Sequence, residues 1–284
     1  SSAESSDPLR RHLMSIRHDY HMHTSRCGHA SGTIEEYIAE AKRKGLAEIG
    51  MSDHLPFVTH RDPQYTMDVS ELPEYHRDME AARAKYAPEL SIKIGIEADY
   101  MQSASDKIAA LLRQYPYDFV IGSVHFMKQP EGDWAFDDPR EIERWKKADI
   151  DEVYRNYYRL LQGAARSGLY DIMGHVDLVK KFGHRPKVDL SELVRQTARV
   201  FGETGVAIEI NTSGLRKPVQ EIYPTLDVLK CYAAERVPIV FGSDAHDPKD
   251  VGADFDRARD LALAAGYTEH LVFKLRKVEK TIRL

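Results

Sequence analysis

Nine side chains of the types that bind divalent metals stand at or just past the ends of apolar runs in this sequence. His21 and His23 form an HxH pair, and Asp244 and His246 form a DxH pair with the same spacing. Residues two apart on an extended strand point to the same face, so each pair can hold one ion. The full set is His21, His23, His29, His54, Glu97, His125, His175, Asp244 and His246. Because metal sites draw such donors from separate stretches of chain, the set predicts a multinuclear metal centre.

Glu97 is the expected centre of this cluster. It ends the apolar run IKIGIE, where an unpaired buried carboxylate would be costly, and its two oxygens can bridge two ions. A single histidine is more often a surface or hydrogen-bonded core residue. We assign to that class His12, His18, His60, His76 and His270. Cys27 lies between two of the histidines, but hard oxygen and imidazole donors dominate the set, and we do not count the thiol as a ligand.

The elements that must position these residues alternate along the chain. Apolar or β-branched runs lie near 16–22, 46–51, 92–96, 118–124, 170–174, 206–210 and 237–242. Helical patterns lie at 33–44, 71–86, 104–114, 149–167, 189–204, 224–235 and 252–265. Seven such units predict parallel strands joined by crossover helices. A closed barrel brings every strand end to one mouth, whereas the outer strands of an open sheet lie too far apart to share a site. We therefore predict an α/β barrel of about seven strands.

The composition limits the class of protein. We expect one barrel domain over 15–284, preceded by a flexible tail over 1–14 that lacks the apolar core of a signal peptide. No run approaches the roughly 18 apolar residues of a membrane span. The two cysteines, Cys27 and Cys231, favour a reducing cytoplasm over a disulfide scaffold. A net charge of −5 argues against a general nucleic-acid binder.

The motifs resemble those of the PHP superfamily of metal-dependent phosphoesterases. The segments GSVHF, GHVDLVKKF, EINTSGLRKP and FGSDAH are most similar to histidinol-phosphate phosphatases. The resemblance implies a single-domain, distorted (β/α)7 TIM-like barrel with three divalent ions, Zn, Fe or Mn. It places His21, His23, Glu97 and Asp244 at the first ion. The second would take Glu97, His125 and His175, and the third His29, His54 and His246. No ligand position is missing, which favours an active enzyme.

The reaction that the resemblance implies is hydrolysis of L-histidinol phosphate to L-histidinol and phosphate, in histidine synthesis. A metal-bound water has its pKa lowered from ~15.7 to about 7. A hydroxide that bridges two ions can then attack phosphorus, while the ions held by Glu97 and Asp244 absorb the developing charge. The small phosphorylated substrate is the expected partner, and no side-chain nucleophile is required.

The residues that contact the substrate are marked less clearly in the sequence than the metal ligands. Arg216 in INTSGLRKP is the expected phosphate ligand, because a guanidinium can donate to two oxygens at once, and Lys217 is the second. The leaving-group acid is Asp53, Asp177 or His184, and His184 is also the third expected substrate contact. Lys180 and Lys181 follow GHVD and could lie at the rim of the site, but we expect them at a solvated helix end.

The stretch 126–148 is longer than an ordinary strand-to-helix loop, so we expect it to form a wall of the pocket. An amine and an imidazole suit acidic or aromatic neighbours. The stretch supplies Phe126, Trp134, Phe136, Asp137 and Asp138. Aromatic residues in such a loop serve packing more often than recognition.

Three other functions fit parts of the pattern. A PHP phosphodiesterase or nucleotide phosphoesterase shares the ligands, but the acidic charge and the absence of a basic, aromatic-rich stretch count against it. A metal-binding module without catalysis would need only the ligands. An amidohydrolase-type enzyme shares the HxH pair and a terminal aspartate. It usually also needs a carboxylated lysine as a bridge, and Glu97 already takes that place.

Overall fold

A computed structural model describes residues 16–130 and 132–284. The tail predicted over 1–14, and His12 within it, lie outside these residues. The central sheet is parallel and has the strand order β1-β2-β3-β4-β7-β8-β9. Its strands are β1 (His18–Asp19), β2 (Glu48–Met51), β3 (Ser91–Asp99), β4 (Phe119–Ser123), β7 (Ile172–Met173), β8 (Ala207–Asn211) and β9 (Ile239–Gly242). The order follows the chain, as expected when each strand is followed by a crossover connection.

The sheet closes into a barrel where β1 meets β9. The Tyr20 N–H donates to the Phe241 carbonyl at 3.0 Å, and the His23 N–H donates to the Ala245 carbonyl at 2.9 Å. Met22 and Ala245 form a parallel bridge just beyond the two strands. The predicted seven-stranded barrel is therefore confirmed, and the open sheet is not found. The barrel is distorted, since β1 and β7 are only two residues long.

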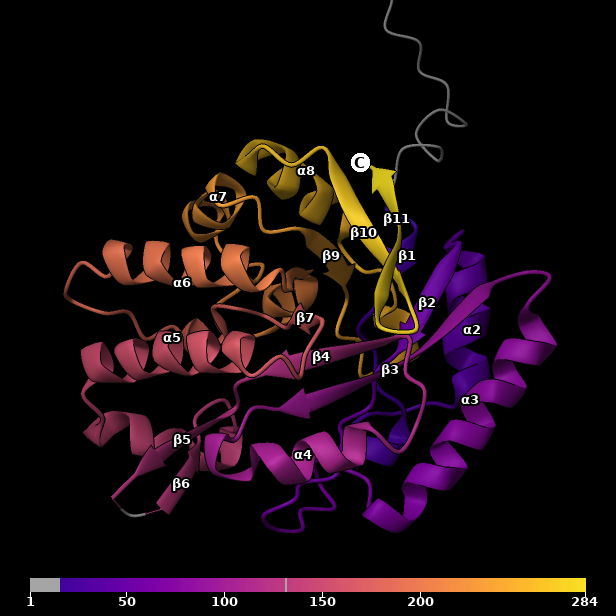
Figure 1. Cartoon of the computed structure of the whole chain (residues 1–284), viewed down its shortest axis with the longest axis horizontal. Helices are drawn as coiled ribbons and strands as arrows, with labels where there is room; N and C mark the ends of the chain where they lie inside the picture. The colour runs from indigo at the N-terminus through magenta and orange to yellow at the C-terminus, as the bar shows by residue number, and fades with distance from the viewer. Residues whose placement is uncertain (1–15, 131) are drawn as a thin grey trace, which may run out of the picture.

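Seven α-helices of the described residues lie around the outside of the strands (Figure 1). They are α2 (Ile34–Arg43), α3 (Leu72–Tyr86), α4 (Ser105–Leu112), α5 (Ile150–Arg166), α6 (Ser191–Thr204), α7 (Leu226–Ala234) and α8 (Phe255–Ala265). Each predicted helix is present within three residues of its expected ends. A capping box between Thr33 and Glu36 begins α2, which satisfies backbone donors at the helix start. None of the described helices is long and apolar enough to cross a membrane.

Shorter elements connect or follow the barrel units. The 3₁₀ turns are η1 (Ser25–Cys27), η2 (Val69–Glu71), η3 (Gln102–Ala104), η4 (Pro139–Lys147), η5 (Leu178–Lys180), η6 (Thr212–Arg216) and η7 (Pro248–Asp250). The two hairpins, which the sequence analysis did not predict, are β5 (Phe126–Gln129) with β6 (Gly132–Ala135), and β10 (Glu269–Lys274) with β11 (Lys277–Arg283). The first hairpin belongs to the stretch 126–148.

The second hairpin packs against the amino-terminal end of the barrel. Val272 and Phe273 of β10 join an interior cluster with Tyr20 and Phe119, whose rings stack at 4.7 Å. The Phe119 ring needs the space beside it, because a Cβ on Gly95 would lie 2.2 Å from a ring carbon. This end of the barrel is therefore filled with side chains, and the carboxyl ends of the strands are left for a site.

His76 in α3 is one of the histidines that we assigned to the fold rather than to the site. Its ring stacks on Tyr115 at a centroid distance of 3.8 Å, and burial lowers its pKa to about 4. The unfolded chain binds a proton near pH 6.5, which the folded protein does not. His76 therefore makes the protein less stable as the pH falls from 6.5 towards 4.

We expect His76→Phe, which keeps the stacking, to lose less thermal stability than the wild type across this range. Thermal melting of both proteins at pH 7 and pH 4.5 checks this. An equal fall in Tm for the two proteins would contradict it.

Candidate metal centre

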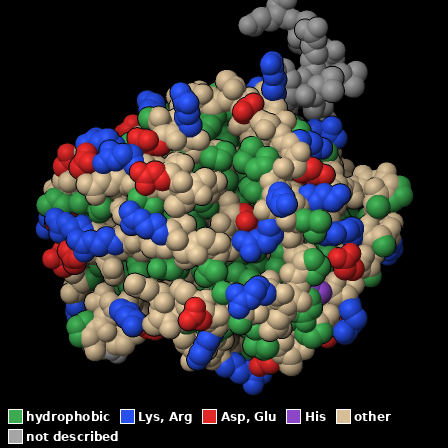
Figure 2. Space-filling model, viewed as in Figure 1, with side chains coloured by type: hydrophobic (Ala, Val, Ile, Leu, Met, Phe, Trp, Pro, Cys, Tyr) green, Lys and Arg blue, Asp and Glu red, His purple; other side chains and the backbone are tan. Residues whose placement is uncertain are grey.

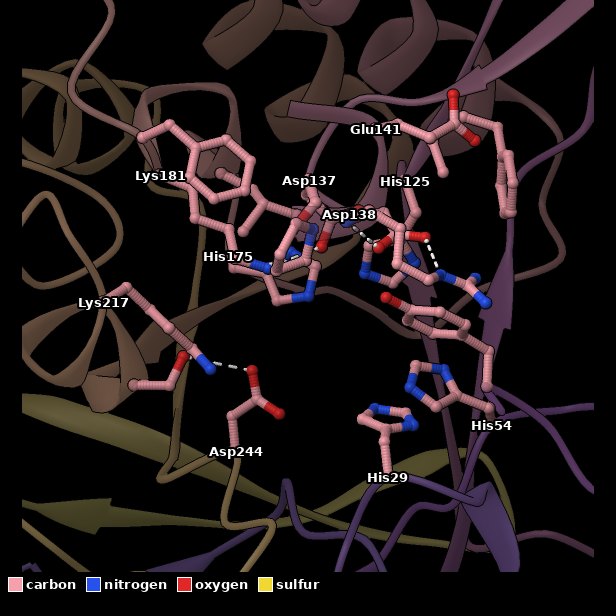
Figure 3. A pocket seen from close by; sticks show the side chains of 18 of the residues that line it. His29, His54, His125, Asp137, Asp138, Glu141, His175, Lys181, Lys217 and Asp244 are labelled. Carbon is pink, nitrogen blue, oxygen red and sulfur yellow. Dashed lines mark hydrogen bonds and ion pairs between the residues drawn. The ribbon is translucent and has the colours of Figure 1, made fainter. Parts of the chain in front are cut away.

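The predicted ligands come together at the carboxyl end of the barrel. His21, His125, His175 and Asp244 each follow the last residue of a strand by two positions, and His54 follows β2 by three. They converge because parallel strands of a barrel end at one mouth. A cavity of about 790 Å³ opens there, and several of the predicted ligands surround its space (Figure 3). His21 and His23 lie beneath its floor, with no exposed surface.

The Oε2 atom of Glu97 faces the first group of donors. It lies 3.1 Å from His21 Nε2 and 3.3 Å from His23 Nε2. The Oδ1 atom of Asp244 lies 3.6 and 3.3 Å from the same two nitrogens. His54 Nδ1 is also 3.2 Å from Glu97 Oε2. His21, His23, Glu97 and Asp244 are the four residues that we expect at the first ion, and His54 lies beside them.

The other oxygen of Glu97 faces the second group. Its Oε1 atom lies 3.2 Å from His175 Nε2 and 3.6 Å from His125 Nε2. It also accepts a hydrogen bond from the Ser123 hydroxyl at 2.6 Å. Each oxygen of the buried carboxylate thus faces a different set of imidazoles, as a bridging ligand requires.

The third group is formed by His29, His54 and His246, whose donor atoms lie within 4.8 Å of one another. His29 Nδ1 contacts the Cys27 and Gln64 carbonyls at 2.9 and 3.0 Å. His246 Nδ1 contacts the Asp244 carbonyl at 3.0 Å. Since a carbonyl only accepts, both Nδ1 atoms carry hydrogen, and the two Nε2 atoms present lone pairs.

Those two Nε2 atoms lie 2.9 Å apart, so two lone pairs face each other. Burial, followed by the charge of His23, lowers the pKa of both His29 and His246, so both rings are held in the neutral form. A cation bound between the neutral imidazoles of His29 and His246 would remove the repulsion between the lone pairs of their Nε2 atoms. Two nitrogens on one zinc, each at about 2.0–2.1 Å, lie roughly 3–3.5 Å apart.

The first group fits a cation for a second reason. His21 Nε2 and both ring nitrogens of His23 are buried without a hydrogen-bond partner among the described residues. Burial alone would raise the pKa of Glu97 and Asp244, but the adjacent histidines hold both pKa values well below the ordinary range. Two anionic carboxylates beside imidazole nitrogens that have no hydrogen-bond partner are a suitable donor set for divalent ions.

Cys27 stays outside the ligand set. Its sulfur lies within 4.8 Å of donor atoms of His23 and His246. However, burial and the charge of Asp53 raise the pKa of the thiol to about 12. Metals bind the thiolate, which this environment disfavours.

A model of the PHP domain matches residues 19–213. The chain belongs to the PHP domain family. It is 38% identical over 262 residues to a probable histidinol-phosphatase of Deinococcus radiodurans, covering 92% of this chain and 98% of that protein. It is 33% identical over 260 residues to the histidinol-phosphatase of Bacillus subtilis, covering 84% of this chain and 97% of that protein.

Two solved structures share the fold. The putative histidinol phosphatase of Listeria monocytogenes has a TM-score of 0.78 and 25% identity, covering 84% of this chain and 99% of that one. The histidinol phosphate phosphatase of Lactococcus lactis, complexed with Zn, L-histidinol and phosphate, has a TM-score of 0.77 and 24% identity. The match covers 93% of this chain and 99% of that one.

The PHP domain site contains two carboxylates that the sequence analysis missed. Glu209 Oε1 lies 2.6 Å from His21 Nδ1, and Asp99 Oδ1 lies 2.8 Å from His125 Nδ1. Both contact histidines that we predict as metal ligands, and such partners orient the ring of a ligand histidine. The signal was present, since each is an acidic residue within the apolar strand segments AIEIN and IEAD.

Arg216 is not among the residues that line the cavity of this PHP domain. Its Nη2 atom donates to the Ser243 carbonyl at 2.6 Å, and its Nε atom lies 3.5 Å from Asp250 Oδ2. The guanidinium of Arg216 therefore points towards Ser243 and Asp250 rather than into the cavity, and its contact with the phosphate stays a prediction. Lys217 does line the cavity, and Figure 3 shows it reaching in beside Asp244.

The two lysines expected at a solvated helix end lie elsewhere. Lys180 is only 1% exposed; its Nζ atom donates to the Ile222 carbonyl at 2.8 Å and pairs with Asp177 at 2.8 Å. Lys181 lines the cavity and contacts the Asp137 carboxylate at 3.0 Å. The expectation was wrong for both, because each charge finds a partner inside the fold.

The three candidate leaving-group acids also lie away from the cavity lining. Asp53 accepts hydrogen bonds from the Thr24 N–H and hydroxyl at 2.7 and 2.8 Å, and Asp177 is paired with Lys180. The His184 ring stacks on Trp145 at 4.5 Å. The structure thus brings none of them, including the substrate contact expected at His184, to the pocket.

The stretch 126–148 forms a wall of the cavity, as predicted. Phe126, Asp137 and Asp138 line it, whereas Trp134 and Phe136 are each 1% exposed and pack in the core. One histidine that we had assigned to the fold, His60, also lines the cavity.

Proposed function

We propose that this PHP domain protein is a metal-dependent phosphomonoesterase that hydrolyses L-histidinol phosphate to L-histidinol and phosphate. The observation that carries the proposal is the convergence of all nine predicted ligands at the mouth of the barrel, in groups around Glu97 and around His54. The histidinol-phosphatase relatives support the substrate. The Lactococcus lactis structure contains L-histidinol and phosphate, the two products of this reaction.

We propose three divalent ions, with zinc, the metal of the Lactococcus lactis structure, as the first to test beside iron and manganese. His21, His23, Glu97 and Asp244 would hold the first. Glu97, His125 and His175 would hold the second, and His29, His54 and His246 the third. Bound ions of this kind supply Lewis-acid stabilisation of phosphoryl oxygens and activate water as a nucleophile.

Lys217 is the residue that we propose for the phosphate group. Burial, and then the charge of Lys181, lowers the pKa of its ammonium. The ammonium forms no ion pair with the described residues. An incoming phosphate dianion would relieve the repulsion between the two lysines and would lie beside Asp244 and its ion.

The effect of Lys217→Ala should appear in substrate binding. We expect KM to rise about tenfold to a hundredfold, since a hydrogen bond to a charged group contributes about 1.5–3 kcal/mol. Arg216→Ala is the matched comparison and should change KM less, because Arg216 contacts Ser243 and Asp250. Steady-state kinetics of both variants decide between the residues. A larger rise in KM for Arg216→Ala would return the phosphate contact to Arg216.

The charge of the protein surface bears on the kind of substrate, and the state of the two cysteines bears on the cellular location. Acidic and basic side chains are interspersed on the face shown in Figure 2, and the net charge is −5, so we propose a small phosphorylated substrate rather than a nucleic acid. Cys27 and Cys231 are both free thiols, which favours a cytoplasmic location.

The test is an assay of phosphate release from L-histidinol phosphate by metal-free protein after addition of Zn, Mn or Fe. Parallel assays on bis-p-nitrophenyl phosphate and short oligonucleotides test the phosphodiesterase alternative. Release from the monoester is the expected result. Folded, metal-loaded protein that cleaves only the diesters would overturn the proposal, and loading without any hydrolysis would indicate a metal-binding module.

A further inference from the structure

Glu209 on β8 is a buried carboxylate with three hydrogen-bond partners. It is 1% exposed. Its Oε1 atom lies 2.6 Å from His21 Nδ1. Its Oε2 atom accepts hydrogen bonds from the His175 backbone N–H at 3.0 Å and from the Asn211 amide at 3.0 Å. Such burial is tolerated because the carboxylate is surrounded by donors.

Asn211 extends this network to a third proposed ligand. Its Nδ2 atom also lies 3.3 Å from Asp244 Oδ2, and the Ser213 hydroxyl donates to the same oxygen at 3.1 Å. The Asn211 Oδ1 atom accepts from the Ser213 N–H at 2.9 Å. Since a backbone N–H only donates, this bond fixes the amide with its NH₂ group towards Glu209 and Asp244.

Two of the ligands in this network have unfavourable backbone conformations. The φ angle is +26° at His175 and +52° at Asp244, a region that residues with a Cβ rarely adopt. Surrounding contacts must hold such residues in place. For His175 the backbone hydrogen bond to Glu209 is one such contact, and for Asp244 the bond from Asn211 is another.

We propose that Glu209 is a positioning residue that fixes the orientation of ligands at the first two metal sites together. By accepting the Nδ1–H of His21, it leaves the lone pair on Nε2, which lies 3.1 Å from Glu97 Oε2. By accepting the His175 N–H, it holds a ligand of the second site. The inference rests on the proposed function through its metal centre and is independent of which phosphate ester is hydrolysed.

Glu209→Gln tests the role with little change of shape. All three partners are donors, so the glutamine NH₂ group must face one of them. If it faces His21, the imidazole has to accept at Nδ1, and its hydrogen moves to Nε2, where the ion should bind. We expect the affinity for zinc to fall about tenfold to a hundredfold, measured by equilibrium dialysis of metal-free protein with the ions counted by elemental analysis.

Glu48→Gln is the matched control. Glu48 is another buried carboxylate on a barrel strand, but it accepts hydrogen bonds from Tyr20 and Ser91, which are not ligands. It should bind zinc as the wild type does. A purely structural role of Glu209 would lower Tm in the Gln variant without changing zinc affinity, and that result would overturn the proposal.

A measurement on the wild type covers the case in which Glu209→Gln does not fold. In zinc-loaded protein labelled with ¹⁵N-histidine, NMR should show the His21 ring with its hydrogen on Nδ1. A hydrogen on Nε2 would contradict the proposal. Neither measurement uses a substrate, so failure to hydrolyse L-histidinol phosphate would leave this inference testable by itself.

Discussion

Replacing Glu97 with glutamine is expected to lower kcat/KM for L-histidinol phosphate by roughly a thousandfold or more, about 4 kcal/mol of transition-state stabilisation. Glu97 is 1% exposed, and its two oxygens face different sets of histidine nitrogens. Glutamine keeps the shape but offers a single oxygen, so it cannot bridge two ions. Its NH₂ group would also point at ring nitrogens that the ions should occupy. Steady-state phosphate release by zinc-reconstituted variant and wild type measures the loss.

The control for this variant is again Glu48→Gln, which removes a buried carboxylate on β2 without touching the centre. It should retain activity close to that of the wild type, and circular dichroism should show both variants folded. Wild-type turnover by folded Glu97→Gln protein at the same zinc concentration would refute the assignment of Glu97 as the central ligand.

Removal of the metal is expected to abolish activity and to lower thermal stability together. Without ions, His21 Nε2 and both ring nitrogens of His23 have no hydrogen-bond partner among the described residues, and the facing Nε2 atoms of His29 and His246 repel each other. Because ions bind the folded state alone, each site filled at a thousand times its Kd contributes about 4 kcal/mol to stability. Dialysis against a chelator should leave about 1% of the activity or less, since the activated water is lost.

Elemental analysis and thermal melting of the same samples complete this experiment. Adding zinc, manganese or iron back should restore phosphate release and Tm in proportion to the ions bound. Protein shown to be free of metal that still releases phosphate at the original rate would place the chemistry elsewhere in the cavity.

Much of the fold could be predicted because the barrel strands are apolar runs that alternate with helical patterns. All seven strands and seven helices arise where those patterns lie. The hairpin of β10 and β11 was missed, since β11 is exposed along nearly its whole length and has no apolar face to mark it. The run at 16–22 forms only two residues of regular strand in β1, where the chain closes the barrel against β9.

The sequence by itself was enough to select the nine side chains proposed for the metal centre, because metal binding restricts the donor types and a barrel gathers the ends of its strands. It did not determine which other residues lie beside these side chains or point into the cavity. Arg216 and Lys217 are adjacent, yet the end of η6 turns one towards Ser243 and the other into the cavity. Likewise, Glu209 and His21 meet at 2.6 Å across a separation of 188 residues. Side-chain direction at a turn, and contact between distant strands, depend on closure of the barrel, which only the tertiary structure decides.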